Sequence, residues 1–222
     1  MRLKSPVLFL VKLMNYAEKI EEALVIQERY LSFFPQIVVK IGPFPSKYNP
    51  NLGVNASAKN FLYAGGKLAG QILKTTHTGY LQLAVVGLRT LFEMSVNAVY
   101  IFNHPKIGQK KRHMRKVCKE IIYLANKKRN VNHTRIDNKS FKQRLQEVGI
   151  GYLYNKNYRV MSDWAHLMSQ TLYISTDQDK GQKFGVEIAK NCLYALHNIF
   201  DAISAYAKFE LNPGLEKSVV SY

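Results

Sequence analysis

The sequence predicts an all-α protein, a single helical bundle of about six to seven helices. Two observations support this fold class. Along most of the 222 residues, apolar side chains recur three and four positions apart, which places them on one face of a helix. The alternation of apolar and polar residues that indicates β-strands is almost absent. At this length the chain can bury one good hydrophobic core, so we expect a single domain.

The domain prediction covers 1-222 and divides it into four parts. An N-terminal helix occupies 1-34, a loop rich in proline and glycine occupies 35-55, the helical core occupies 56-211, and a flexible tail occupies 212-222. The breaks at Pro35, Gly42 and Pro43 define the loop. Within it, Val38–Ile41 is compatible with one short extended piece.

The elements follow from periodicity and from turn residues. The first helix covers about 5–33. Asn55 or Ser57 can cap a second helix that reaches about Thr76. This second helix contains three glycines, which either weaken it or let a neighbouring helix approach closely. Those glycines are Gly65, Gly66 and Gly70.

The third helix, from about Gly79 to Asn103, is the most apolar and should be the core helix. A basic helix at 108–129 and a short helix at 139–148 follow, and Gly149 ends the short one. Another helix is expected at 152–174, and a final one at 183–211 before Pro213.

The net charge is +17 and is concentrated in one part of the chain. Between Lys106 and Arg144 there are 14 lysines and arginines against Glu120 and Asp137, a local charge of +12. Such a block binds polyanions by releasing counterions, although many charge runs are only solvated surfaces. The expected nucleic-acid-binding residues are Lys110, Lys111, Arg112, Arg115, Lys116, Lys119, Lys127, Lys128 and Arg129.

Other classes of protein are not indicated. No uninterrupted apolar run approaches the ~20 residues of a membrane helix, so no membrane contact is expected. Cys118 and Cys192 have no partner spacing, and the histidines show no ligand spacing, so neither a metal nor another cofactor is predicted. No cleavable signal is recognisable at the N-terminus, which together with the cysteine usage favours the cytoplasm.

The most informative stretch runs from Tyr158 to His166. On a helix, Arg159 and His166 differ in direction by only about 20°. Tyr158, Ser162 and His166 follow at i, i+4 and i+8, and Asp163 lies four residues after Arg159. One helix would then present a guanidinium, a hydroxyl, a carboxylate and an imidazole on a polar stripe. This stripe is either an active site or a buried hydrogen-bond network.

Two charges, Arg89 and Glu93, interrupt the core helix at i and i+4. Buried charges are costly unless they are paired. They can pair with each other, or with Asp163 and His166 across the bundle. In either case the core helix and the helix of Tyr158 are expected to touch. The contact is either a network that fixes how the helices pack or a polar pocket in which Arg89 binds phosphate or orients Glu93.

These motifs resemble a known family. Arg89-Thr90-Leu91-Phe92-Glu93, then Tyr100, and later Tyr158, Ser162 and His166 look like a widespread bacterial family of helical proteins of uncharacterised function. Its pattern is an R-x-L-x-E helix followed by a Y-x-x-x-S-x-x-x-H helix, and the resemblance covers about residues 80–210. That family is in turn similar to the HEPN helical domains.

The resemblance implies a HEPN-like fold and a function. Many HEPN proteins are metal-independent ribonucleases that act as toxins or antiviral effectors, and they carry an arginine four to six residues before a histidine. Arg159 and His166 match with six residues between them. Those nucleases usually have a polar residue after the arginine, whereas Val160 stands here. They commonly form their site across a homodimer, which the resemblance therefore implies for this chain.

Metal-free RNA cleavage defines the expected roles. His166 would act as general base or acid, and Arg159 would contact the phosphate. Tyr158 and Ser162 would position the substrate or the imidazole. The full set of candidate catalytic residues is Arg159, His166, Ser162, Tyr158, Arg89 and Glu93.

Three functions remain open at this stage. The first is a HEPN-like endoribonuclease that acts as a toxin or antiphage defence effector on RNA. The second is a non-catalytic basic module that binds nucleic acid or an acidic protein partner, such as an antitoxin, in a defence complex. The third is a small-molecule enzyme that uses Glu93 and His166 as an acid–base pair.

Overall fold

The computed structural model describes residues 6–42, 52–103, 141–147, 149, 158–159, 161–162 and 178–211. These residues contain five helices and no strand, so the all-α prediction is confirmed. The helices are α1 (Pro6–Ile41), α2 (Leu52–His77), α3 (Leu81–Asn103), α5 (Phe141–Glu147) and α8 (Gln178–Ala207). Residues 158–159 and 161–162 are also helical. The basic helix expected at 108–129 lies outside the described residues.

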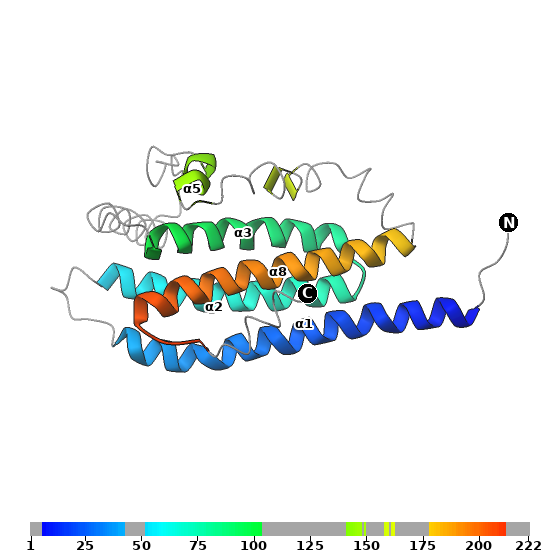
Figure 1. Ribbon diagram of the computed structural model, residues 1–222, viewed down its shortest axis with the longest axis horizontal. Coiled ribbons are helices and arrows are strands. Elements are labelled where there is room, and N and C mark those ends of the chain that lie inside the picture. Colours follow the sequence, from blue (N-terminus) through cyan, green and yellow to red (C-terminus); the bar gives the residue numbers. More distant parts are fainter. Residues whose placement is uncertain are drawn as a thin grey trace, which may run out of the picture.

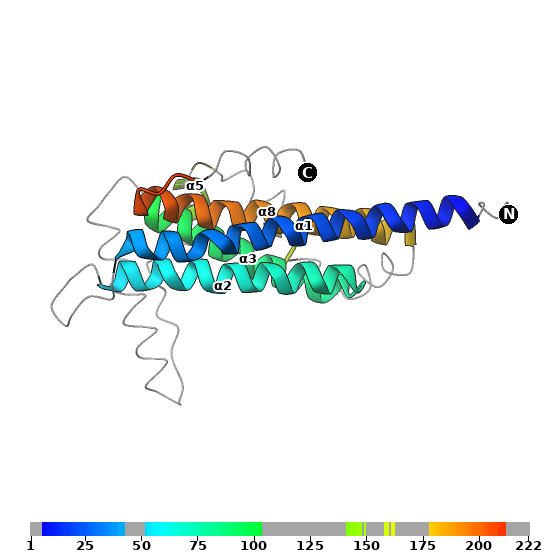
Figure 2. The same cartoon turned by 90° about the horizontal axis from the view of Figure 1, so that it is seen from below.

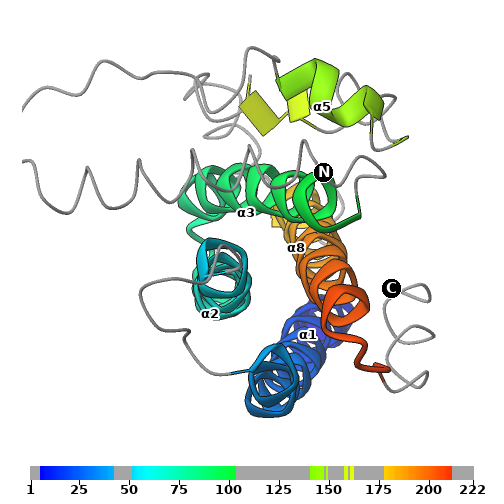
Figure 3. The same cartoon turned by 90° about the vertical axis from the view of Figure 1, so that its left-hand side faces the viewer.

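Four long helices form the bundle, and α5 lies on the outer side of α3 (Figure 1). Seen from the end of the bundle, α3 and α1 occupy opposite corners, and both α2 and α8 lie between them (Figure 3). The most extensive packing is between α3 and α8. α3 therefore has the bundle on one side, while α5 lies over one end of its other side.

The direction of each helix follows from contacts at the two ends of the bundle. The hydroxyl of Tyr16, in α1, donates to the carbonyl of Thr76 at the end of α2. At the opposite end, Asn55 of α2 donates to the carbonyl of Ile41 and accepts from Tyr206 near the end of α8. Thus α2 runs antiparallel to α1, and α8 runs parallel to α1 (Figure 2).

The core consists of apolar side chains from all four long helices. Fully buried members include Tyr30, Leu73, Leu91 and Phe200, one from each long helix. As expected of a core helix, α3 contributes many buried apolar side chains, among them Leu88, Leu91 and Val96, and packs against both α2 and α8. By length and composition alone, Leu81–Phe102 could also cross a membrane, but over half of that segment is buried in the bundle.

The three predicted glycines of α2, Gly65, Gly66 and Gly70, all mark close approaches between helices, and a Cβ atom at Gly66 would collide with the Cδ2 of Leu31 on α1. A Cβ atom at Gly65 would lie 2.9 Å from the Cδ1 of Ile199 on α8. At Gly70 it would lie 3.2 Å from the Nε2 of Gln27 on α1. Gln27 also donates to the carbonyl of Gly66 at 3.0 Å. Close packing, one of the two predicted roles of these glycines, is therefore confirmed.

The predicted end of the first helix was wrong, because α1 continues through Pro35 to Ile41. A proline inside a helix removes one hydrogen bond and costs about 3 kcal/mol. Ile37 and Ile41 are buried against the bundle, and this packing offsets the cost. The extended piece expected at Val38–Ile41 is therefore helical.

The predicted start of the second helix was also wrong. α2 begins at Leu52, so Asn55 is not its cap. The side chain of Asn55 instead reaches the carbonyl of Ile41, and the Nζ of Lys59 donates to the carbonyl of Gly42 at 2.9 Å. These bonds satisfy carbonyls at the end of α1, which have no partner within their own helix.

The last helix covers Gln178–Ala207 rather than 183–211. The next residue, Lys208, terminates the helix, because its φ of +54° lies in the left-handed region. This position is several residues before Pro213. The amide of Phe209 closes the turn on the carbonyl of Ser204 at 2.9 Å. Gly149, with a φ of +79°, follows α5 as the sequence predicts.

Candidate functional site on the outer face of α3

The outer face of α3 carries a row of polar side chains. Arg89, Glu93 and Asn97 follow at i, i+4 and i+8, so each is displaced by only about 40° from the one before. The apolar residues of the same helix, including Leu88 and Leu91, are buried in the bundle. The polar row therefore points away from the bundle, toward α5 and the segment that contains Tyr158.

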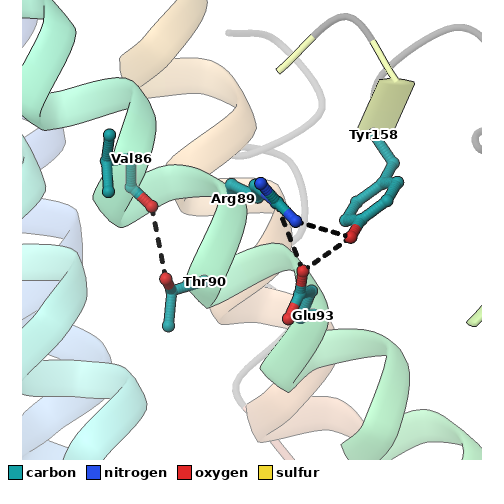
Figure 4. Close-up of polar contacts among 5 residues, drawn as sticks. All are labelled: Val86, Arg89, Thr90, Glu93 and Tyr158. Carbon is teal, nitrogen blue, oxygen red and sulfur yellow. Dashed lines mark hydrogen bonds and ion pairs between the residues drawn. The ribbon is translucent and has the colours of Figure 1, made fainter. Parts of the chain in front are cut away.

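Arg89, Glu93 and Tyr158 form a closed hydrogen-bond triangle (Figure 4). The Nε of Arg89 donates to the Oε1 of Glu93 at 3.3 Å, and its Nη2 donates to the Tyr158 hydroxyl at 3.1 Å. That hydroxyl donates to the same carboxylate oxygen at 2.8 Å. The guanidinium carbon of Arg89 also lies 5.3 Å from the centre of the Tyr158 ring. We call these three residues the Arg89 triangle.

The Arg89 triangle is only partly buried. The side chains of Arg89 and Glu93 are 29% and 39% exposed, so their ion pair is screened and contributes up to about 1 kcal/mol. The hydrogen bond to Tyr158 raises the pKa of Arg89. Burial, together with the bond to Glu93, raises the pKa of Tyr158. Tyr158 is therefore protonated near neutral pH and acts as a donor to Glu93, not as a base.

An aromatic cluster holds Tyr158 in this position. Its ring lies 4.4 Å from the ring of Phe141 on α5 and 6.4 Å from that of Phe92 on α3, between ring centres. Phe92 and Phe141 also meet edge to face at 6.4 Å. Aromatic pairs at such distances add about 0.5–1.5 kcal/mol each beyond the area that they bury. Tyr158 is therefore fixed on α3 by ring contacts as well as by its hydroxyl.

A second polar contact joins α5 to the same row. The Nη1 of Arg144 donates to the Oδ1 of Asn97, and the guanidinium lies 5.7 Å from the Phe141 ring centre. The Nε of Arg144 is buried and has no hydrogen-bond partner among the residues that the structure describes. None of the described carboxylates pairs with this guanidinium. Among the described residues, its charge therefore meets only neutral groups, the Asn97 amide and the Phe141 ring.

The described residues of the predicted stripe lie on two different sides of their helix. Tyr158 is half-buried and bonded to α3, Met161 is buried, and Ser162 is partly buried. Arg159 is exposed and makes no hydrogen bond or ion pair with another described residue. The expected contact between the core helix and the Tyr158 segment is confirmed, but Tyr158 and Arg159 do not lie on one continuous face. His166 and Asp163 lie outside the described residues.

Other predicted site residues also fall outside the described part of the chain. These are the basic residues Lys110, Lys111, Arg112, Arg115, Lys116, Lys119, Lys127, Lys128 and Arg129. Over the residues that the structure describes, no group of three or more His, Cys, Asp or Glu side chains is arranged to hold a metal ion.

Sequence reasoning did not single out Asn97, Phe141 or Arg144 as site residues. A signal for Asn97 was available, because it follows Glu93 by four residues on an otherwise apolar helix. Arg144 was counted only as part of the basic block, since nothing in its own helix indicates a partner that lies 47 residues away.

The site combines three arginines with one carboxylate. Arg89 is paired, Arg144 is held by Asn97, and Arg159 extends into solvent next to Tyr158. Together with Glu93 they give a local excess of positive charge, which suits an anionic ligand. The chain matches no protein-family model, no curated protein and no solved structure. The function must therefore be inferred from the site itself.

Proposed function

We propose that the protein is a HEPN-like endoribonuclease that cleaves RNA without a metal ion and acts as a toxin or defence effector. The observation that supports this most strongly is the Arg89 triangle. It joins the two motifs that carry the family resemblance, across 65 to 69 residues of sequence. It also fixes Tyr158 so that the next residue, Arg159, is exposed and available to a phosphate.

In this proposal the Arg89 triangle positions other residues and takes no part in the reaction itself. The carboxylate of Glu93 already accepts from Arg89 and Tyr158, and the Tyr158 hydroxyl stays protonated. Neither group is suited to remove a proton from a substrate. Arg89, Glu93 and Tyr158 are therefore positioning residues, and the contacts with RNA fall to Arg159 and His166.

The reaction is an internal transesterification of RNA. His166 accepts the proton of a ribose 2′-hydroxyl, whose oxygen attacks the adjacent phosphorus. The bond from phosphorus to the 5′ oxygen breaks, and that oxygen takes a proton from water, while the proton held by His166 neutralises the hydroxide that remains. The products carry a 2′,3′-cyclic phosphate and a 5′-hydroxyl. Arg159 donates to the phosphate oxygens while negative charge develops on them. Ser162 orients the imidazole or the substrate.

Partners follow from the same proposal. RNA is the expected ligand, because a chain with a charge of +17 gains affinity for polyanions by counterion release. The homodimer implied by the resemblance remains part of the proposal, as does the cytoplasmic location. An acidic antitoxin would bind the same positive surface and compete with RNA.

A second function is favoured by one specific observation. The residues of the Arg89 triangle bond to one another across two segments of the chain, as in a structural network that fixes the packing of helices. A protein in which this is the only role of the motifs would be a non-catalytic module that binds nucleic acid or an acidic partner. It would bind RNA in a salt-dependent way without cleaving it.

The test is RNA cleavage by purified protein in EDTA. Wild type is compared with Arg159→Ala, His166→Ala and the matched control Arg29→Ala, which removes an exposed arginine from α1. The proposal expects cyclic-phosphate ends from wild type and from the control, and a loss of at least about 100-fold in both site variants. Circular dichroism checks that each variant is folded. Salt-sensitive binding without cleavage by wild type would favour the binding module.

A further inference from the structure

A second basic surface lies on α2, outside the residues discussed so far. Within Leu52–His77 there are three lysines and no aspartate or glutamate. The neighbouring long helices are balanced, since α1 has four basic and four acidic residues and α8 has three of each. The described helices therefore place an excess of positive charge on α2, where no acidic side chain of the same helix offsets it.

The outward side of α2 is a continuous stripe of exposed side chains. Their positions differ by three or four residues, so they fall within about 80° around the helix axis and extend about 21 Å along it. We call this stripe the α2 track. It consists of Asn60, Tyr63, Lys67, Gln71 and Lys74, all exposed.

Tyr63 is an exposed aromatic ring with a fixed position. It is 51% exposed, and its ring centre lies 6.2 Å from that of Phe34 on α1. The Nζ of Lys67 lies 4.5 Å from the centre of the same ring. A supported tyrosine next to a lysine can stack on a nucleobase while the ammonium contacts its phosphate, and stacking contributes about 1–3 kcal/mol per base.

The borders of the α2 track also suit a polyanion. The most exposed side chains of the neighbouring helix α3 are Leu83, Val86 and Thr90, which carry no charge. On the α1 side, Glu21 lies 3.8 Å from His77, near one end of α2. The part of the stripe between Tyr63 and Lys74 therefore faces no described carboxylate within ion-pair distance.

We propose that the α2 track binds single-stranded RNA, with Tyr63 stacked on a base and Lys67 and Lys74 at phosphates. The two lysines are seven residues apart and lie about 10 Å apart along the helix axis, so they contact different phosphates. The exposed ring favours a single strand, because the bases of a duplex are already stacked on each other. This inference rests on the proposed function and names the surface that holds the substrate.

The experiment measures binding of a fluorescently labelled 2′-O-methyl oligouridylate, which cannot be cleaved by attack of a 2′-hydroxyl. Anisotropy titrations over a range of salt concentrations compare wild type with Tyr63→Ala, Tyr63→Phe and the double variant Lys67→Gln/Lys74→Gln. The matched control is Lys40→Gln/Lys183→Gln, which removes two exposed lysines from α1 and α8. Thermal melting checks the fold of each variant.

We expect Tyr63→Ala to weaken binding about tenfold and Tyr63→Phe to retain it, because both rings stack. Each phosphate contact contributes about 0.7 to the magnitude of the slope of log K, the association constant, against log salt concentration. Removing the two track lysines should therefore lower this magnitude by about 1.4. Equal effects in the control variant, or tighter binding of the matching duplex, would overturn the inference.

The failure of this inference is distinguishable from failure of the proposed function. If wild type binds the oligonucleotide and cleaves RNA, but the track variants bind as the control does, only the inference about the α2 track is overturned. Wild type that shows the track effects but cleaves no RNA overturns the nuclease and keeps the track. Wild type that neither binds the oligonucleotide nor cleaves RNA overturns both.

Discussion

The two faces of α3 differ in what they contact and in what they contribute. The inner face buries Leu88 and Leu91 against the other long helices. The outer face presents Arg89, Glu93 and Asn97 to Tyr158 and α5 through hydrogen bonds. One helix therefore has an apolar side that holds the bundle together and a polar side that positions segments distant in sequence.

The difference shows why charges are tolerated on the most apolar helix. Arg89 and Glu93 are not in the core, as their 29% and 39% exposure indicates. They lie where α3 meets a partly solvated outer layer, so their desolvation is incomplete. Changes on the inner face should therefore affect folding, and changes on the outer face should affect mainly the position of Tyr158 and α5.

The largest effect is expected on the inner face. Leu91→Ala removes a fully buried side chain that packs beside Gly65 of α2, and such truncations cost about 2–5 kcal/mol. Urea unfolding measures the change. The control is Leu83→Ala on the same helix, whose side chain is 66% exposed and whose loss should cost under about 0.5 kcal/mol. Equal costs would show that the two faces of α3 do not differ.

The next effect is expected at Tyr16, a partly buried residue of α1 that packs against the core. The hydroxyl of Tyr16 donates to Thr76 between α1 and α2, and burial raises the pKa of Tyr16 to about 12. The unfolded chain loses this proton near pH 10, so stability should fall as pH rises from about 10 to about 12. Tyr16→Phe should flatten this fall in unfolding measurements. If the free energy of unfolding of Tyr16→Phe falls with pH as it does in wild type, groups other than Tyr16 cause the fall.

A smaller effect is expected where α5 joins the outer face. Asn97→Ala removes the acceptor of the Arg144 guanidinium and should cost about 1.5 kcal/mol, the lower end of the range for bonds to charged groups. Hydrogen exchange should show faster exchange for the amides of α5 and unchanged protection in α2 and α8. A uniform loss of protection across the bundle would mean that Asn97 stabilises the core and not only the docking of α5.

The smallest effect on stability is expected in the Arg89 triangle. Tyr158→Phe keeps the aromatic contacts and removes the hydroxyl, so the free energy of unfolding should fall by about 1 kcal/mol. Glu93→Gln should cost a similar amount. Since both substitutions affect the same bond, the double variant should cost less than the sum of the two. Additive costs would mean that the hydroxyl and the carboxylate do not interact in solution.

Much of the fold was predictable because the helical spacing of apolar residues indicates which side chains are buried. The core helix and the close packing at the α2 glycines followed from apolar spacing and residue size. The end of α1 did not, since the burial of Ile37 and Ile41 outweighs the local preference of Pro35. Tertiary contacts of this kind are not visible in the sequence around the proline.

The candidate site was predictable where helical spacing brings residues together, and the contact of α3 with the Tyr158 segment was expected from the charges on an apolar helix. Arg89 and Glu93 pair as expected from their i, i+4 spacing. The direction of Arg159 was not predicted, because the side of its helix that faces α3 is set by Phe92 and Phe141. The Arg144–Asn97 bond was missed for the same reason, as it depends on where α5 docks.

The central claim is that the outer face of α3 positions the RNA-contacting residues without holding the fold together. The most direct measurement is metal-free RNA cleavage beside thermal melting for Glu93→Gln, Tyr158→Phe and the double variant. We predict that cleavage falls to a similar low level in all three while the melting temperature changes by only a few degrees. Cleavage that stays at the wild-type level in folded variants would contradict the claim and make the Arg89 triangle a purely structural network.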